Sequence, residues 1–233
     1  MSPGASDFVV LFDIDGTLVG PPDSGSSAGF EAMNAAAERL TGSRPYEDVV
    51  QFAGRTDPQI ARALLELAGE RDPLRERVFE LLGHYLDLLE RNVADRPYAL
   101  LGDPRAAVAA VERGGGTVGL GTGNVARGAR IKFESAGIGD LFDLERGGFG
   151  DDGAHRFEVL AAGARRCDPS GSAPVVVVGD TPHDVEAALA IDALCIGVPF
   201  RANTADLLRE AGAHDIVDAV GPDLVERIRA LGV

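Results

Sequence analysis

The chain has 233 residues, of which 45% are hydrophobic and 25% are charged. This composition is typical of a globular protein, and the length suffices for one domain or for a domain that carries an insertion. The formal net charge of −15 disfavours binding to nucleic acid or to an anionic membrane surface.

The sequence shows no sign of export or of membrane insertion. The N-terminal residues, Met1 to Asp7, are polar, and no apolar stretch approaches the roughly 20 residues that span a bilayer. Cys167 and Cys195 are too few for a disulfide framework. We therefore expect a cytoplasmic enzyme or binding protein.

The first predicted strand, Phe8–Phe12, ends directly before the motif Asp13-Ile14-Asp15-Gly16-Thr17. Residues two apart on a strand point the same way, so the carboxylates of Asp13 and Asp15 can face one site. At the carboxyl edge of a parallel sheet, such a pair can supply a nucleophile, a proton donor and ligands for a hard cation. A strand end with turn-forming aspartates is the structural alternative.

Residues 21–96 follow, and they are helical in pattern with no convincing strand. Two apolar stripes at helical spacing run through them, one from Phe30 to Leu40 and one from Leu74 to Leu89. We interpret these stripes as core-packing faces and the stretch as a small helical domain inserted after the first strand. Residues 1–20 and 97–233 then form the other domain.

The rest of the chain alternates strand-like runs with helical patterns. The runs are Thr117–Leu120, Val175–Val178 and Ala193–Val198, with weaker ones at Leu141–Leu144 and His214–Val217. The helical patterns are Asp103–Arg113, Val125–Ala136, Phe157–Arg166, Asp184–Ala190 and Ala202–Ala211. This alternation predicts an α/β fold with a mostly parallel sheet.

Two further motifs stand at predicted strand ends. In Gly121-Thr122-Gly123-Asn124, a hydroxyl and free N–H groups before a helix suit a phosphate oxygen, although Asn124 can equally be a helix cap. Asp180 follows Val175–Val178, with Asp184 four residues later, and these acids can complete an oxygen shell for Mg²⁺ or belong to a capped turn. We expect His183 to be a solvated loop residue.

Lys132 is the only lysine among 22 basic residues. It lies on the helix that begins at the Thr122–Asn124 turn, where a compact ammonium can balance a carboxylate nucleophile and a phosphate together. A solvated helix lysine is the alternative. Arg156, near the start of the helix before Val175–Val178, is the competing cation.

Together these motifs resemble the four motifs of the haloacid dehalogenase superfamily, in its phosphoglycolate phosphatase and β-phosphoglucomutase-like branch. The matching residues are Asp13-x-Asp15-Gly16-Thr17, Thr122 with Asn124, a lysine, and Gly179-Asp180-x-x-x-Asp184. The resemblance covers nearly the whole chain. It implies a Rossmann-like core with the first strand central, and a helical cap at residues 21–96.

The resemblance also implies a role for each acid. Asp13 would attack phosphorus and become an aspartyl-phosphate, and Asp15 would protonate the leaving alkoxide and then activate water. Mg²⁺ would be held by the Asp13 carboxylate, the Asp15 backbone carbonyl and Asp180, with Asp184 in support.

Phosphate binding and charge balance are assigned to residues of other motifs. The resemblance assigns Thr122, Gly123 and Asn124 to phosphate oxygens and a lysine to charge balance. Many members carry that lysine ahead of the last motif strand, where this chain has Arg156, whereas some carry it where Lys132 lies. We therefore expect Lys132 to fill the role, with Arg156 as helper or replacement.

One segment of the insertion, Gly54–Pro58, is expected to touch the substrate, because similar segments form the specificity loop of related phosphatases. Arg55, with its neighbour Thr56, can reach an anionic leaving group. A helix start with Asp57 as the N-cap and Pro58 first in the helix is a compatible alternative.

Asp15 favours phosphoryl transfer, because family members that displace halide lack this second aspartate. The insertion contains no lysine for the Schiff base of phosphonate-cleaving members. We therefore predict a Mg²⁺-dependent phosphatase of a small, soluble phosphorylated metabolite, a monomer or weak homodimer without nucleic-acid or membrane partners. A sugar phosphomutase and a non-catalytic phospho-ligand-binding protein are the alternatives.

Overall fold

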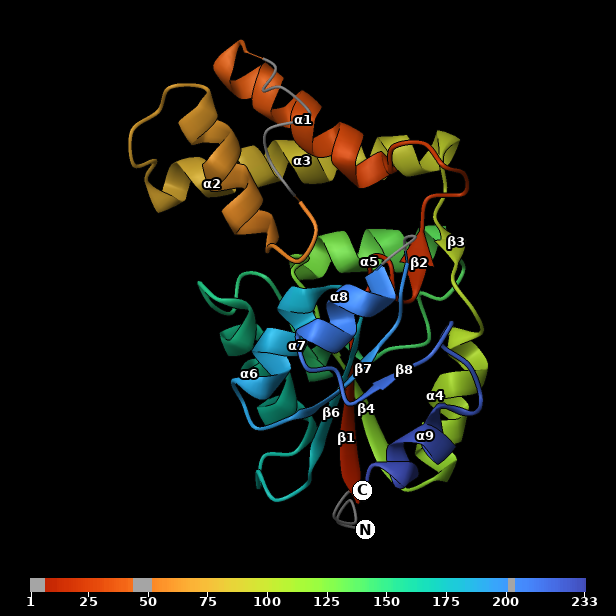
Figure 1. Ribbon diagram of the computed structural model, residues 1–233. Helices are drawn as coiled ribbons and strands as arrows, with labels where there is room; N and C mark the ends of the chain where they lie inside the picture. The colour runs from red at the N-terminus through yellow and green to blue at the C-terminus, as the bar shows by residue number, and fades with distance from the viewer. Residues whose placement is uncertain (1–6, 44–51, 201–203) are drawn as a thin grey trace.

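The computed structural model of the protein describes residues 7–43, 52–200 and 204–233. Figure 1 shows a sheet flanked by helices and, above it in that view, a further group of helices. Within the described ranges, no helix combines the length and the apolarity needed to cross a membrane.

The core is a six-stranded sheet in the order β5-β4-β1-β6-β7-β8, and its paired strands run parallel. The strands are β1 (Phe8–Phe12), β4 (Gly116–Gly121), β5 (Gly147–Gly148), β6 (Val175–Gly179), β7 (Leu194–Gly197) and β8 (Asp215–Ile216). β1 lies in the middle, hydrogen-bonded to β4 on one side and to β6 on the other. This arrangement confirms the predicted α/β, Rossmann-like parallel sheet.

Helices cover both faces of the sheet, which is why β1 and β6 are almost entirely apolar. On β1, Val9 and Leu11 belong to a buried cluster with side chains of α6 and α7, whereas Phe8, Val10 and Phe12 belong to a cluster with side chains of α4, α5 and α9. The helices are α4 (Pro104–Arg113), α5 (Ala126–Ser135), α6 (Arg156–Cys167), α7 (Pro182–Leu189), α8 (Thr204–Glu210) and α9 (Leu224–Ala230).

Within the described ranges, three helices lie between β2 and β3, two short strands that pair antiparallel. The elements are β2 (Val19–Gly20), α1 (Ala28–Thr41), α2 (Asp57–Leu67), α3 (Arg75–Asp95) and β3 (Ala99–Leu100). We refer to residues 21–96 as the helical unit. Its helices α1 and α3 pack side by side over buried residues such as Met33 and Leu82, and α3 also contacts α5 of the core (Figure 1).

The strand predicted at Leu141–Leu144 is wrong. Leu144–Arg146 forms a 3-10 turn, and β5 follows at Gly147–Gly148. Two glycines carry no apolar signal, yet a Cβ atom on Gly148 would collide with the carbonyl oxygen of Val159 on α6, so close packing selects the small residue. The predicted start of the helix at Ala202 lies outside the described residues.

Candidate active site

The two aspartates that follow β1 lie in a tight loop at the carboxyl edge of the sheet. The N–H of Asp13 donates to the carbonyl oxygen of Val178 on β6 (2.9 Å), which continues the parallel pairing past the end of the strand. Gly16 then adopts a φ of +81°, and a Cβ atom there would collide with the Asp180 carboxylate. Glycine thus allows both the turn and the approach of Asp180.

Asp13, Asp180 and Asp184 bring carboxylate oxygens within 4.8 Å of one another. Both oxygens of the buried Asp184 are occupied, since one accepts from Arg156 (2.6 Å) and the other from the N–H and hydroxyl of Thr181 (3.1 and 2.7 Å). The carboxylate of Asp180 has no hydrogen-bond partner within the part of the chain that the structure describes. Asp180 is therefore the acid of this cluster most open to a new ligand.

Burial is the main influence on the pKa values of Asp13 and Asp180. It raises the pKa of Asp13 to about 6 against the opposing charge of Arg156, and the nearby Asp184 and Asp15 add to the rise. Burial, together with the charges of Asp184 and Asp13, also raises the pKa of Asp180 well above its usual range. Carboxylates held this close together favour a divalent cation among them.

Arg156, the first residue of α6, is the cation that contacts Asp13. Its Nη2 lies 2.7 Å from Asp13 and 2.6 Å from Asp184, and the side chains of all three are buried. Burial acts to lower the pKa of Arg156, but the charges of Asp184 and Asp13 outweigh it and raise that pKa above its usual range. Arg156, considered at first as a helper or replacement for Lys132, thus lies against the first aspartate of the motif.

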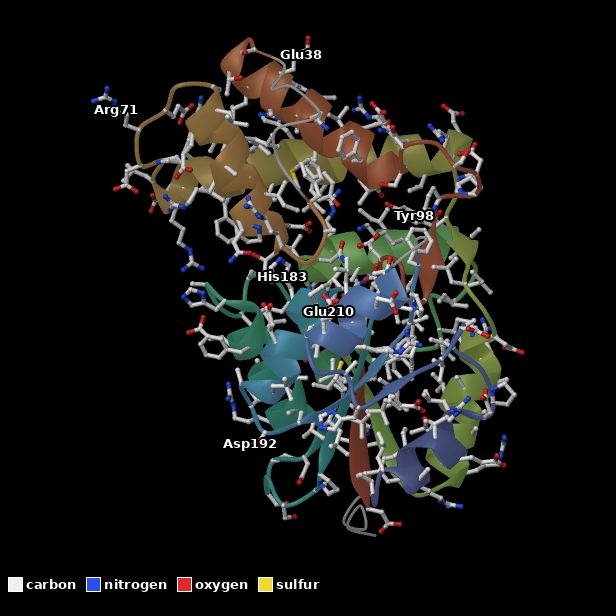
Figure 2. The ribbon with its side chains drawn as sticks, in the orientation of Figure 1. Glu38, Arg71, Tyr98, His183, Asp192 and Glu210 are labelled. Atoms are coloured by element: carbon white, nitrogen blue, oxygen red, sulfur yellow. The ribbon has the colours of Figure 1, made fainter. Side chains whose placement is uncertain are left out.

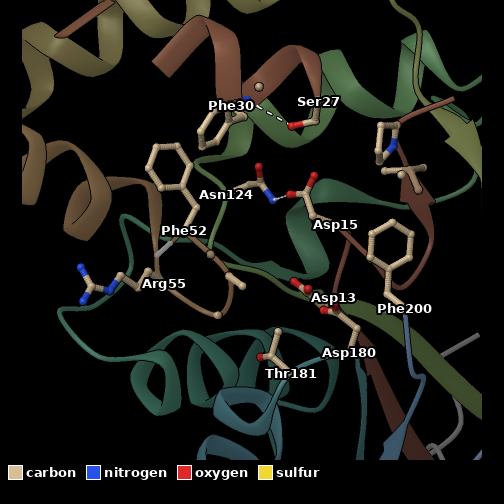
Figure 3. Close-up of a pocket in the computed structure, with 18 of the residues that line it drawn as sticks. Asp13, Asp15, Ser27, Phe30, Phe52, Arg55, Asn124, Asp180, Thr181 and Phe200 are labelled. Carbon is tan, nitrogen blue, oxygen red and sulfur yellow. Dashed lines mark hydrogen bonds between the residues drawn. The ribbon is translucent and has the colours of Figure 1, made fainter. Parts of the chain in front are cut away.

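Lys132 lies on α5 with its ammonium directed at Asp15. Its Nζ donates to Asp15 Oδ2 (2.6 Å) and to Asn124 Oδ1 (2.5 Å), and it lies 5.5 Å from the centroid of the Tyr98 ring. The side-chain amide of Asn124 donates to the same Asp15 oxygen (2.8 Å), as Figure 3 shows. Burial acts to lower the pKa of Lys132, but the charge of Asp15 and other neighbouring groups raise it well above its ordinary value. The single lysine therefore binds the second aspartate of the motif.

The Thr122–Asn124 loop, after β4, lies at the same edge. The hydroxyl of the fully buried Thr122 accepts from the N–H and from the side-chain amide of Asn124 (3.3 and 2.9 Å). Asn124 does not cap α5, whose N-cap residue is Val125. A Cβ atom on Gly123 would collide with the carbonyl oxygen of Arg55, so glycine lets the loop pass close to the helical unit. The predicted phosphate-binding residues thus lie beside the aspartates.

Helix α2 begins against this loop. Its N-cap is Thr56, whose hydroxyl accepts from the N–H of Gln59 (3.3 Å), so the expectation that Asp57 caps the helix is wrong. Asp57 faces the core instead. Its N–H donates to the Gly123 carbonyl (2.7 Å) and its buried carboxylate accepts from the N–H of Val125 (2.9 Å). We call this pair of hydrogen bonds the Asp57 clip, and it ties the helical unit to the phosphate-side loop.

Two other predicted residues lie at the rim. Arg55 is exposed, and Figure 3 shows its guanidinium directed away from Asp13 and Asp15. His183 lies near the boundary between the core and the helical unit (Figure 2), with 55% of its side chain exposed and its Nδ1 3.4 Å from Glu186. His183 is thus solvated as predicted, although it belongs to the first turn of α7 and not to a loop.

A cavity of about 650 Å³ lies between the core and the helical unit. Its core side carries the charged residues Asp13, Asp15, Lys132, Arg156 and Asp180. Its other walls include Phe30, Met33, Phe52, Ile60 and Phe200, none of which was predicted as a site residue. Periodicity assigned Phe30 to a packed helix face, because spacing alone cannot distinguish a core residue from one that borders a cavity.

The sequence model of the haloacid dehalogenase-like hydrolases matches residues 9–192 of the chain. The chain belongs to this family. It is therefore a hydrolase, as the order of its four motifs indicated. The probable phosphatase IndB of Dickeya dadantii (strain 3937) is 29% identical to it over 219 residues, which cover 90% of this chain and 89% of that relative.

Solved structures of haloacid dehalogenase-like proteins share the fold. CbbY from Rhodobacter sphaeroides, in complex with phosphate, superposes with a TM-score of 0.68 at 17% identity, covering 94% of this chain and 96% of that one. A hydrolase of family IA, variant 3, from Entamoeba histolytica gives a TM-score of 0.69 at 18% identity, covering 94% and 99%. At such identities the similarity establishes the fold, and the chemistry has to be argued from the residues.

Proposed function

We propose that this hydrolase is a Mg²⁺-dependent phosphatase that cleaves a small, soluble phosphomonoester through an aspartyl-phosphate on Asp13. The family match and the similarity to IndB support the general activity, a phosphatase. The finer proposal rests on one observation, which is that the two aspartates after the central strand are bound by different cations. Arg156 lies against Asp13 and Lys132 against Asp15. Two acids in separate environments suit two separate chemical roles.

In the first half-reaction, one oxygen of Asp13 attacks the phosphorus while Arg156 holds the other. The bond between phosphorus and the leaving oxygen breaks, and the alkoxide takes a proton from Asp15. In the second half-reaction, water attacks the phosphorus of the aspartyl-phosphate and gives a proton to Asp15. Phosphate leaves, and Asp13 is restored as a carboxylate.

The phosphate would lie against the loop after β4. We assign its oxygens to the Thr122 hydroxyl and to the backbone and side-chain groups of Gly123 and Asn124, which lie beside both aspartates. In the transition state, negative charge spreads over the phosphoryl oxygens. Lys132 and Arg156 supply the positive charge that stabilises it. Most of the acceleration then comes from positioning and electrostatics.

The acidic cluster suits a magnesium ion. We assign the Asp13 and Asp180 carboxylates as ligands together with the Asp15 backbone carbonyl, and Asp184 as the support that orients them through Arg156. The fit rests on hard oxygen donors within 4.8 Å of one another and on an Asp180 carboxylate without a partner in the described residues. When bound, Mg²⁺ supplies the charge that lets an anionic phosphate approach these acids.

We further propose that residues 21–96 form a cap domain over a core of residues 1–20 and 97–233. The cavity between the two, the Asp57 clip and the contact of α3 with α5 support this division. A cap in this position would exclude bulk water from the aspartyl-phosphate and would select the leaving group.

The test is phosphate release from a panel of small phosphomonoesters, with Mg²⁺ and with EDTA. We expect Mg²⁺-dependent release that Asp13→Asn lowers by at least about a thousandfold, because the nucleophile is lost. Asp192→Asn is the matched control, since Asp192 is exposed in the left-handed region (φ 57°) that asparagine also adopts. Equal rates for Asp13→Asn and the control enzyme would rule the proposal out.

A further inference from the structure

The cavity has two chemically different sides. The core side holds the acids and both buried cations, where the phosphate would lie. The opposite side carries apolar side chains from α1, from α2 and from the segment before α2. The volume, about 650 Å³, lies within the range of roughly 300–1,000 Å³ that is typical of sites for whole small molecules. The cavity therefore has room for a leaving group much larger than a few carbon atoms.

Aromatic rings define the apolar side. Phe30 and Phe52 lie with ring centroids 4.8 Å apart and planes tilted by 47°, and Figure 3 shows them side by side, with Phe200 on the other side of Asp15. All three side chains are only partly buried, so apolar ring surface is open to the cavity. Met33 and Ile60 also line the cavity. An apolar group placed here would remove that surface from water.

Several polar groups on this side already bind other groups of the protein. Ser27 Oγ accepts from the N–H of Phe30 (3.1 Å), and the Tyr98 hydroxyl accepts from the N–H of Gly29 (3.1 Å). The Asp57 carboxylate accepts from the N–H of Val125. A sugar or other polyhydroxylated leaving group would have to share these groups with the backbone N–H groups that they already accept from.

The buried cations of the cavity bind groups on the core side and not on the apolar side. Lys132 and Arg156 are bound to carboxylates of the core. Arg55, from the helical unit, is exposed and directed away from the aspartates (Figure 3). In this arrangement a second anionic group on the substrate would face aromatic rings, while the Arg55 guanidinium lies at the rim of the cavity.

From these contacts we infer that the leaving group carries a bulky apolar moiety, such as an aromatic ring, which packs against Phe30 and Phe52. This inference names the substrate class of the same site, and it rests on the proposed phosphatase activity. It replaces the expectation that Arg55 receives an anionic leaving group.

The test compares kcat/KM for 3-phenylpropyl phosphate, n-propyl phosphate and phosphoglycolate with Mg²⁺. The first two release alcohols of nearly equal acidity. The ratio of their kcat/KM values therefore measures the contribution of the phenyl ring and not a difference in the chemical step. We expect the phenyl compound to be favoured at least about tenfold over n-propyl phosphate, because one ring is removed from water. Phosphoglycolate should be the poorest of the three.

Substitutions of Phe30 and Phe52 then test where the phenyl ring of the substrate binds. Phe30→Ala and Phe52→Ala should each lower the phenylpropyl-to-propyl ratio at least about threefold, and Phe30→Leu should lower it less because it keeps apolar volume. The ratio is taken within one preparation, so a general loss of activity does not affect it. Phe79→Ala is the matched control, since Phe79 lies on α3, is 36% exposed and borders no part of the cavity.

The outcomes separate the two proposals. Phosphate release without preference for the phenyl compound, or with preference for phosphoglycolate, overturns the substrate class and leaves the phosphatase proposal intact. A phenyl preference that Phe79→Ala lowers as much as Phe30→Ala also overturns it. The absence of release from every phosphomonoester, including the wider panel, overturns both.

Discussion

Asp15 lies in a clamp made by an ammonium and an amide. Lys132 and Asn124 both donate to the same carboxylate oxygen, and Lys132 also donates to Asn124, so the three side chains fix one another. A proton donor must be held within hydrogen-bond reach of the leaving oxygen, and this clamp sets its orientation. Lys132 is thus a positioning residue for Asp15 in the proposed reaction.

We expect Lys132→Met to lower kcat by about a hundredfold, because Asp15 loses the group that orients it. Arg130→Met is the control, since Arg130 is exposed on the same helix. Steady-state kinetics with a substrate that needs no proton on leaving, such as 4-nitrophenyl phosphate, should show a smaller loss, which reports the charge that Lys132 supplies to the transition state. An equal loss on both substrates would contradict the positioning role.

Arg156 is the cation that two buried carboxylates share, so its removal should lower the stability of the protein. Arg156→Met leaves Asp13 and Asp184 close together without it. In EDTA at pH 7.5, we expect the free energy of unfolding to fall by about 3 kcal/mol, the usual cost of breaking a buried ion pair. Urea denaturation measures it.

The matched control is Arg166→Met on the same helix, where Arg166 pairs with Asp152 and is 41% exposed. Partly exposed pairs contribute at most about 1 kcal/mol. If both variants lost the same stability, Arg156 would not be acting as the counter-charge of the cluster. Comparing the kcat of Arg156→Met with that of Lys132→Met also shows which of the two cations matters more for the nucleophile Asp13.

At the scale of elements, apolar periodicity predicted the strands that carry the motifs. β1 and β6 are continuous apolar runs with side chains in both buried clusters, so their positions could be read from composition. In β4 the apolar signal is weaker, since Val118 and Leu120 alternate with glycines. β5 could not, because two glycines selected by contact with α6 carry no such pattern. The same limit applies to the site. Motif order brought the acids together, but the reach of a side chain from α5 or α6 decides which cation meets which aspartate.

Helix α2 supplies a prediction through the Asp57 clip. Burial raises the pKa of Asp57 to about 6, from about 4 in an unfolded chain. The folded state thus holds this proton more tightly, so the contribution of Asp57 to stability is greatest below pH 4 and declines as the pH rises from 4 to 6. Asparagine keeps an oxygen that accepts from Val125 and has no such titration.

We therefore expect Asp57→Asn to gain stability relative to the unmodified protein as the pH rises from 4 to 7, by an amount on the order of 2 kcal/mol. Urea denaturation at several pH values gives this difference. Asp192→Asn, at an exposed aspartate, is the control, and the pH dependence for Asp57→Asn should exceed the one measured for it. A pH dependence for Asp57→Asn no larger than that of the control would show that the carboxylate is not buried against the core in solution.

For the whole molecule, the acidic cluster links metal binding to stability. A ligand that binds only the folded state stabilises it by about 1.4 kcal/mol when present at ten times its Kd. We expect Mg²⁺ to raise the Tm of the EDTA-treated protein by a few degrees in a thermal unfolding experiment. Asp180→Asn should abolish the rise and Asp192→Asn should keep it. A rise that survives Asp180→Asn would place the ion elsewhere.

The antiparallel pair β2 and β3 has a consequence for how the molecule is built. Gly20 is in register with Ala99, so the chain leaves the core and returns to it at neighbouring points. Paired residues of antiparallel strands lie about 5 Å apart, a gap that a two-residue turn closes. The residues between Gly20 and Ala99 are therefore an insertion into what would otherwise be a β-hairpin of β2 and β3. A core with Asn-Gly in place of residues 21–98 keeps every strand connection of the large sheet. The helical unit can thus be exchanged for another segment without changing the strand connections of the large sheet.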